Sequence, residues 1–269
     1  ANEINHYIII GAKTIRPSLR FLFTKNLKYR PPIHKPQTRG VAMPNNAPQS
    51  PYTLHVGREG EKRLSNLNGI YNDDSRKFLT QAGLADRKSI AEVGCGTGIM
   101  TCWIASQIDP KGTVLATDIN SEQVKLTQQR AQKEELTNIT VQQVAGDTFA
   151  PEHQVDFIST RFVLAHVPSP GKIIDAMLRA LKPGGTIAIE EAITSGHQCT
   201  PPSPIFQRYL EIWSGVRLAQ GADPDYGLKL SEELQNRGVQ INISQRTSQA
   251  LPPGQLGLRN IFASNLKEA

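Results

Sequence analysis

The sequence has few of the features that mark secreted or membrane-spanning proteins. It holds no apolar run of about 18 residues, the length that a transmembrane helix needs, so no membrane span is expected. Its three cysteines, Cys95, Cys102 and Cys199, form neither a CxxC pair nor a disulfide framework, which favours a reducing, cytoplasmic location. No group of His, Cys, Asp and Glu has metal-ligand spacing, so no metal is expected.

Acidic residues are almost absent from the first 40 residues. That segment carries four Lys and four Arg but a single acid, Glu3, while the whole chain has a net charge of +6. The excess positive charge therefore belongs to this segment, and the rest of the chain is close to neutral. A basic groove for nucleic acid within the fold is not expected.

Residues 1–50 differ in composition from the remainder and end in a stretch rich in Pro and Asn. We expect a basic, disordered tail that is dispensable for ligand binding. Three interpretations stay open: an organelle presequence, which would make the protein mitochondrial; a basic interaction arm; and upstream sequence without a function.

From residue 51 to residue 269, strand and helix patterns alternate in the manner of a single α/β domain. Strands are predicted at residues 89–93, 113–117, 139–144, 155–160, 186–192 and 239–243. Helices are predicted to begin at Asp73 or Asp74 and at Asn120, and to cover residues 99–108, 173–181, 206–213, 230–237 and 258–266. This alternation predicts a doubly wound, mostly parallel sheet, with a core at about residues 86–192 and a capping region at about 193–238.

A glycine-rich loop follows the first predicted strand of this core. The loop reads Ala-Glu-Val-Gly-Cys-Gly-Thr-Gly over residues 91–98 and leads into a helix. Glycines at such spacing let the backbone approach a ligand, and the helix N-terminus offers free N–H groups. Taken alone, the spacing is equally typical of a structural turn.

Three further motifs follow in order. Asp118 ends the second strand, where a carboxylate can accept hydrogen bonds from ribose hydroxyls. Gly146 and Asp147 follow the third strand, and a Leu-Lys-Pro-Gly-Gly segment at residues 181–185 precedes the fifth. Four such elements in this order favour a nucleotide-like ligand over four unrelated turns.

This series resembles the motifs of class I S-adenosylmethionine-dependent methyltransferases, in their small-molecule branch. The resemblance covers about residues 52–250 and implies S-adenosylmethionine as cofactor and a small organic molecule as methyl acceptor. It implies the following cofactor-binding residues: Tyr52, Glu92, Gly94, Cys95, Gly96, Gly98, Asp118, Ile119, Gly146, Asp147, Thr148, Arg161 and Phe162.

The sheet of this family usually ends with an antiparallel strand inserted beside the last parallel one. After the strand near Val239 the sequence offers a turn and one more helix, so we expect the chain to lack that strand.

Two other functions compete with methyl transfer. An NAD(P)-dependent oxidoreductase normally carries G-x-G-x-x-G, whereas here the third glycine comes one residue early. A non-catalytic cofactor-binding or scaffold protein of the same fold stays open, because methyl transfer needs few diagnostic side chains.

The catalytic residues are not defined by the sequence. His166 is the nearest candidate for a base, although a role as pocket wall is the stronger interpretation, and His55 and His197 are weaker still. The stripe of Phe206, Tyr209 and Trp213 suits either a lid or core packing, and Glu190 and Glu191 suit either a pocket or a solvated strand end.

Overall fold

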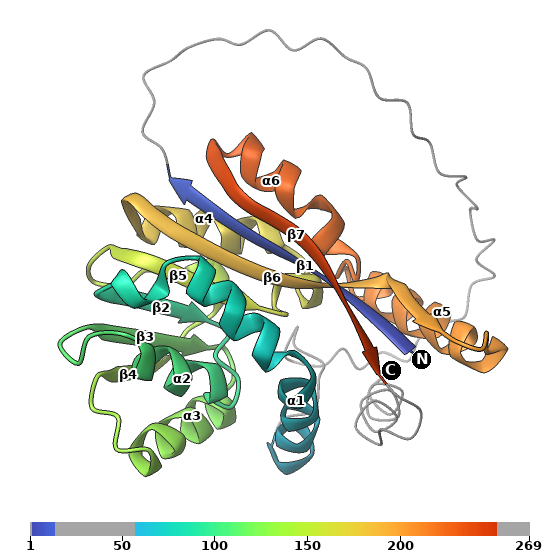
Figure 1. The fold of residues 1–269 in the computed structure, drawn as a ribbon, viewed down its shortest axis with the longest axis horizontal. Helices are drawn as coiled ribbons and strands as arrows, with labels where there is room; N and C mark the ends of the chain where they lie inside the picture. Colours follow the sequence, from blue (N-terminus) through green and yellow to red (C-terminus); the bar gives the residue numbers. More distant parts are fainter. Residues whose placement is uncertain (1, 14–56, 252–269) are drawn as a thin grey trace, which may run out of the picture.

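A seven-stranded sheet forms the centre of the computed structural model, which describes residues 2–13 and 57–251 (Figure 1). The strand order is β4-β3-β2-β5-β6-β1-β7. Strands β4, β3, β2, β5 and β6 run parallel to one another, whereas β1 is antiparallel to both β6 and β7. The predicted α/β class with a mostly parallel sheet is confirmed.

The strands are β1 (Asn2–Lys13), β2 (Ser89–Val93), β3 (Thr113–Asp118), β4 (Ile139–Gln143), β5 (Val155–Arg161), β6 (Leu181–Cys199) and β7 (Val239–Leu251). The α-helices are α1 (Gly57–Gln81), α2 (Ile99–Gln107), α3 (Ser121–Lys133), α4 (Pro170–Ala180), α5 (Pro204–Ala219) and α6 (Leu230–Asn236). Short 3₁₀ turns are η1 (Leu84–Asp86), η2 (Gly146–Thr148), η3 (Leu164–His166) and η4 (Tyr226–Lys229).

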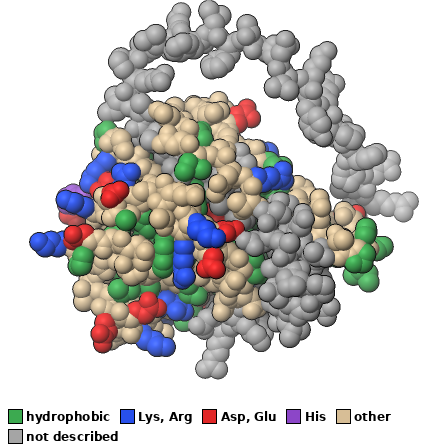
Figure 2. Space-filling model, viewed as in Figure 1, with side chains coloured by type: hydrophobic (Ala, Val, Ile, Leu, Met, Phe, Trp, Pro, Cys, Tyr) green, Lys and Arg blue, Asp and Glu red, His purple; other side chains and the backbone are tan. Residues whose placement is uncertain are grey.

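Alternating side chains of the parallel strands build a core on each face of the sheet. On one face, Ile158 and Ile189 pack with Ile174 of α4 and Leu234 of α6. On the other, Phe157 and its neighbours pack with side chains of α1 and α2. Strands buried on both faces explain why the sequence shows short apolar runs between helices. Figure 2 shows one outer face, where basic and acidic side chains lie among one another.

The N-terminal strand corrects two predictions. Asn2–Lys13 was assigned to a disordered tail, yet it forms β1, which pairs along its length with β6 and β7. It supplies an antiparallel strand beside the last consecutive parallel one, at the place where that strand was expected to be missing. The sequence signal is the run of Tyr and three Ile at residues 7–10, which has high β propensity. Residues 14–50 lie outside the described residues.

Two element boundaries also differ from the sequence-based ones. Helix α1 begins by Gly57, well before the predicted cap at Asp73 or Asp74. Strand β6 runs on to Cys199 instead of ending at Ala192, because β1 continues the pairing beyond β5. The helix predicted at 258–266 lies outside the described part of the chain. No helix within the described residues is long and apolar enough to cross a membrane.

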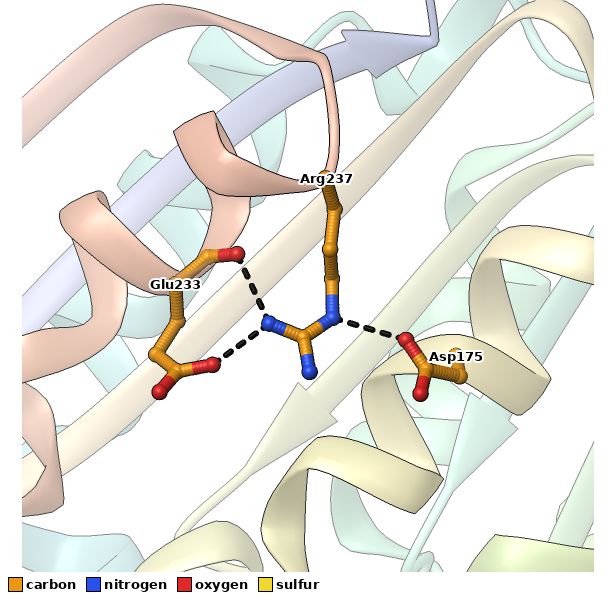
Figure 3. Close-up of polar contacts among 3 residues, drawn as sticks. All are labelled: Asp175, Glu233 and Arg237. Atoms are coloured by element: carbon orange, nitrogen blue, oxygen red, sulfur yellow. Dashed lines mark hydrogen bonds and ion pairs between the residues drawn. The ribbon is translucent and has the colours of Figure 1, made fainter.

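Helices α4 and α6 are joined by a charged contact. Arg237, which follows α6, donates through Nε to Asp175 of α4 over 2.7 Å (Figure 3). Its Nη1 also donates to the backbone carbonyl of Glu233 over 2.8 Å and contacts the Glu233 carboxylate. The contact secures the outer layer over the β6 and β7 side of the sheet.

Candidate functional site

A cavity of about 440 Å³ lies at the carboxyl ends of β2, β3, β5 and β6. Its lining comes from three parts of the chain: α1, the loops that follow these strands, and the segment from the end of β6 to α5. Loops at the carboxyl ends of parallel strands are where ligands bind in open α/β sheets. The cavity therefore joins the predicted cofactor loop to residues far away in the sequence.

The loop after β2 is held against the end of β3. The backbone N–H groups of Gly94 and Cys95 both donate to the carbonyl of Thr117, over 2.8 and 2.9 Å. Gly96 has φ +56°, and a Cβ there would have Leu64 at 3.5 Å, on the cavity side. The positive φ explains why glycine occupies this position.

Gly98 has a different role from the one predicted. It does not line the cavity, and a Cβ on it would lie 2.8 Å from the Thr127 side chain and 2.9 Å from the Thr127 backbone. This glycine allows close packing of α2 on α3. Cys95 does line the cavity, and burial raises the pKa of its thiol well above the ordinary value, so it is no ready nucleophile.

Asp118 is positioned by backbone donors. Its carboxylate accepts from Gly96 N over 3.0 Å and from Asn120 N over 2.9 Å. Burial nevertheless raises the pKa of Asp118, opposed by these hydrogen bonds. Beside it, the cavity lining includes Ile119, Gly146 and Asp147. Thr148, predicted to contact the same ligand, is not in the lining, and its hydroxyl donates to Ala145.

Glu92 lies under the loop and faces the cavity. It is buried, and the hydroxyl of Thr101 in α2 donates to its carboxylate. Burial raises the pKa of Glu92 to about 7, although the Thr101 hydrogen bond and nearby Arg161 oppose the shift. Glu92 therefore changes its charge near neutral pH.

Arg161, at the end of β5, ties the sheet to α1. Its guanidinium donates over 3.0 Å to both Asn72 and Ser75 and also bonds to Asn68. Ser75 in turn donates to Glu190 over 2.7 Å. Burial lowers the pKa of Arg161 and raises that of Glu190 to about 7, while each charge favours the other. This network fixes α1 as one wall of the cavity.

Phe162 adopts a backbone conformation that is unusual for a residue with a side chain. Its φ is +54°, and its ring packs edge-on against Tyr71 of α1 at 5.0 Å between centroids. Such strain persists only where surrounding contacts impose it, and it gathers at functional sites. Both Arg161 and Phe162 line the cavity.

Neither interpretation of the paired glutamates holds. Glu190 and Glu191 are buried, and neither lines the cavity. Glu191 accepts hydrogen bonds from the backbone N–H groups of three successive residues, Val163 to Ala165, and so fixes the turn that carries His166. Its pKa is raised to about 7 by burial, against the effect of those bonds.

His166 lines the cavity but is already engaged by Arg217 of α5. The Arg217 guanidinium donates to the His166 carbonyl over 3.0 Å and lies 3.3 Å from the ring Nδ1. Because Arg217 can only donate, Nδ1 must accept in that contact, and the ring proton is on Nε2. Burial, then Arg217 and Arg63, lower the pKa of His166 to about 3. A neutral ring with this tautomer suits a wall and not a proton acceptor.

The far end of the cavity is formed by residues that the sequence did not single out as ligand contacts. Thr194 and His197 come from the end of β6, and Tyr209, Leu210 and Trp213 come from α5. The three α5 residues also pack together with Phe206, so the stripe is a small core and a cavity wall at once. No periodicity distinguishes such a wall from ordinary core packing.

Comparison with known proteins identifies the fold around this cavity. Residues 91–189 match the family model described as a methyltransferase domain. The part of the chain that carries the glycine loop, Asp118 and Arg161 is therefore similar to methyltransferase domains. Within this methyltransferase domain lie all the predicted site residues except Tyr52, which is outside the described residues.

Among curated relatives, a demethylmenaquinone methyltransferase of Lactobacillus johnsonii is 24% identical over 164 residues, covering 58% of this chain and 64% of that enzyme. A ubiquinone biosynthesis O-methyltransferase of Psychrobacter cryohalolentis is 30% identical over 143 residues, covering 52% of each protein. The chain thus spans between half and two thirds of the length of these relatives. A methyltransferase structure from Aquifex aeolicus matches 55% of this chain and 79% of its own, with 23% identity and a TM-score of 0.47.

The sequence missed the contribution of α1 to the methyltransferase site. Arg63, Leu64, Leu67, Asn68 and Tyr71 all line the cavity, at the i, i+1, i+4, i+5 and i+8 positions of one helix face. Arg63 is only 6% exposed, and its Nε has no hydrogen-bond partner among the described residues. The four-residue spacing of Arg63, Leu67 and Tyr71, which places them on one helix face, was the signal available in the sequence.

Proposed function

We propose that this protein binds S-adenosylmethionine and transfers its methyl group to a small organic acceptor. The observation that carries the proposal is a single cavity with two chemically different ends. One end holds Asp118, Asp147 and the glycine loop, and the other is walled by Tyr209 and Trp213. Such a cavity can hold a nucleoside-bearing cofactor beside a second, less polar molecule.

The residues at the first end match the parts of the cofactor. Asp118 keeps free lone pairs for two ribose hydroxyls after accepting from Gly96 and Asn120, because a carboxylate offers about four acceptor sites. Ile119 would pack on the adenine, and Asp147 would face its amino edge. The buried, unpaired Nε of Arg63 suits the methionine carboxylate, since a buried cation without a partner is costly.

The protein's own part in the reaction is to position the reactants and to exclude water. When bound, the cofactor's sulfonium supplies an electrophilic methyl group that passes to the acceptor and leaves the neutral thioether S-adenosylhomocysteine. Phe162, Tyr71 and Trp213 line the cavity and would hold the acceptor beside the cofactor while keeping water out. No side-chain nucleophile is needed for this transfer.

A small acceptor suits a cavity of about 440 Å³, which lies in the range typical of small-molecule sites. One relative is named as a demethylmenaquinone methyltransferase and the other as a ubiquinone biosynthesis O-methyltransferase, and these names support a small organic acceptor. A cofactor-binding protein without catalysis is the second candidate. It is favoured if the acceptor needs a histidine base, because Arg217 already occupies Nδ1 of His166.

Two measurements test the proposal. Calorimetry should detect binding of S-adenosylhomocysteine and none of NAD; the reverse result would overturn it. With labelled S-adenosylmethionine, label should appear in the small-molecule fraction of a cell extract. Label in the protein or nucleic-acid fraction would contradict the substrate class, and binding without any transfer would favour the non-catalytic candidate.

A further inference from the structure

The end of β6 contains a bulge that carries two side chains to the cavity. Ile193 of β6 is paired with Asn5 of β1, and Gln198 is paired with Glu3. Four β6 residues, 194–197, therefore face the single β1 residue between those partners. A bulge bends the strand and redirects its side chains, and bulges are common beside active sites. Thr194 and His197, both in this bulge, line the cavity.

The bulge is supported by the turn before η4. The N–H of Thr194 donates to the carbonyl of Pro224 over 3.2 Å, and the N–H of Ser195 donates to Asp225 Oδ1 over 2.8 Å. The backbone of Asp225 is itself held, because its N–H donates to Asp223 over 3.0 Å. These bonds satisfy backbone groups that the bulge removes from the β1–β6 ladder. The bulge is thus fixed on both sides and holds His197 at a defined place.

His197 has no partner within the described structure. Both ring nitrogens are buried, and neither has a hydrogen-bond partner among the described residues. Burial lowers the pKa of His197 to about 4, so the ring is neutral at pH 7 and offers one donor and one acceptor. Leaving such groups unsatisfied costs about 1–3 kcal/mol each, which a bound ligand can recover.

Its surroundings differ from those of His166. Arg217 already occupies Nδ1 of His166, and Arg217 and Arg63 both act on its pKa, whereas burial alone shifts the pKa of His197. The carboxylates among the described lining residues, Glu92, Asp118 and Asp147, all belong to the cofactor end. The end beside Tyr209 and Trp213 therefore has no carboxylate in its described lining, and the guanidinium of Arg217, which lies over the Trp213 ring, is already bonded to His166 and Gln220.

We propose that His197 is the residue that recognises the methyl acceptor, and that it binds a hydroxyl group on an apolar, planar molecule lying against Tyr209 and Trp213. This inference rests on the proposed function. A hydroxyl can donate to one imidazole nitrogen or accept from the other, so it matches a neutral ring. A carboxylate only accepts and an ammonium only donates, and either would lose the hydration of its charge on entering this buried end of the cavity.

The test uses three probes that share one ring: phenol, benzoate and benzylammonium. Each is titrated into the ¹⁵N-histidine-labelled protein saturated with S-adenosylhomocysteine, and the imidazole signals are followed by NMR. Phenol should shift the His197 signals, which are assigned by their loss in His197→Gln. Benzoate and benzylammonium should bind at least tenfold more weakly than phenol.

Three variants separate recognition from packing. His197→Phe keeps a ring but removes both nitrogens, so the affinity for phenol should fall at least tenfold. His197→Gln keeps one donor and one acceptor, so its affinity for phenol should stay within about threefold of that of the unmodified protein. His153→Gln, at an exposed histidine, should change nothing. Thermal melts of each variant show whether the fold persists, and the shift of the His197 signals by phenol in the unmodified protein carries the test if the Phe variant unfolds.

The outcomes distinguish the two proposals. Equal binding of phenol to the Phe and unmodified proteins, tighter binding of either charged probe, or no shift of His197 by any probe would overturn the role of His197. Calorimetry with S-adenosylhomocysteine on the same proteins tests the proposed function separately. If that ligand does not bind, the proposed function fails, and the phenol titrations without it still decide the hydroxyl preference of His197.

Discussion

The backbone N–H of Gly96 donates to the carboxylate of Asp118 over 3.0 Å and joins two motifs that lie 22 residues apart. The bond connects the turn after β2 to the end of β3. The position of the Asp118 carboxylate, and of any ligand bound to it, therefore depends on the conformation of the glycine loop, because Gly96 donates to that carboxylate. Loop geometry and ribose recognition form one unit.

Replacing Asp118 with Ala should weaken the binding of S-adenosylhomocysteine by tenfold or more. Hydrogen bonds that involve a charged group are worth about 1.5–3 kcal/mol each, and tenfold corresponds to about 1.4 kcal/mol. The loop also loses its bond from Gly96. Calorimetry gives the dissociation constants, and Asp86→Ala, at an exposed acid in η1, is the matched control. Unchanged affinity in Asp118→Ala would show that ribose is bound elsewhere.

Gly96→Ala and Gly98→Ala should separate binding from stability. At Gly96 the new Cβ meets Leu64 at 3.5 Å on the cavity side, so ligand affinity should fall more than stability. At Gly98 it lies under 3.0 Å from the Thr127 backbone, so the melting temperature should fall more. Both positions have positive φ, so at each of them alanine also adds backbone strain of about 1–2 kcal/mol. Thermal melts and calorimetry on both variants compare the loss of stability with the loss of ligand affinity. A loss of affinity in Gly98→Ala as large as that in Gly96→Ala would show that Gly98 contacts the ligand.

Binding of S-adenosylmethionine should strengthen as pH rises from 5.5 to about 7 and then level off. The pKa of Glu92 is raised to about 7 by burial, so the ligand-free protein holds this proton below that pH. A cationic ligand favours the ionised carboxylate, and binding therefore releases the proton. Affinity should rise by up to about tenfold per pH unit below 7.

Glu92→Gln should remove this pH dependence. Glu190 and Glu191 also have a pKa of about 7, but they do not line the cavity and are the internal comparison. Calorimetry in buffers of different ionisation enthalpy measures the released proton directly. A flat affinity profile in the unmodified protein would contradict the raised pKa of Glu92.

Ile8→Pro should destabilise the protein, whereas Asn2→Pro should not. Ile8 lies in the middle of β1 and is paired with Glu190 on one side and Gln245 on the other. Proline removes its N–H, and the partner left unsatisfied costs about 1–3 kcal/mol. Asn2 is the first residue of the strand, where proline is tolerated. Denaturant melts of both variants decide whether β1 is integral to the sheet; equal stability would restore the tail interpretation.

Arg237→Ala should lower the free energy of unfolding by about 1 kcal/mol, and less in high salt. Arg237 is 23% exposed and bonds to Asp175, which is 48% exposed, so solvent screens part of the attraction (Figure 3). Arg208→Ala, which breaks a more exposed pair with Glu211 within α5, should have no measurable effect. Denaturant titrations at two salt concentrations compare them. A loss independent of salt would assign the effect to packing of the Arg237 stem.

The sequence by itself determined the sheet and the cofactor end of the site. The glycine loop, Asp118 and the Gly146–Asp147 pair each follow a strand, and parallel strands bring their carboxyl ends to one edge. Local spacing therefore suffices to place these residues together. Periodicity also marked α4 and β5, because their apolar faces repeat over short distances in the chain.

Only the tertiary structure decided the other end of the site. Arg161 meets Ser75 across 86 residues, and Arg217 meets His166 across 51, so no local pattern reports these contacts. His197 faces the cavity because β1 and the turn at Asp225 impose a bulge on β6. Residues 2–13 were assigned to the basic segment 1–50, but their pairing as β1 depends on backbone hydrogen bonds to partners far along the chain. Long-range pairing of this kind is settled only when the whole sheet assembles.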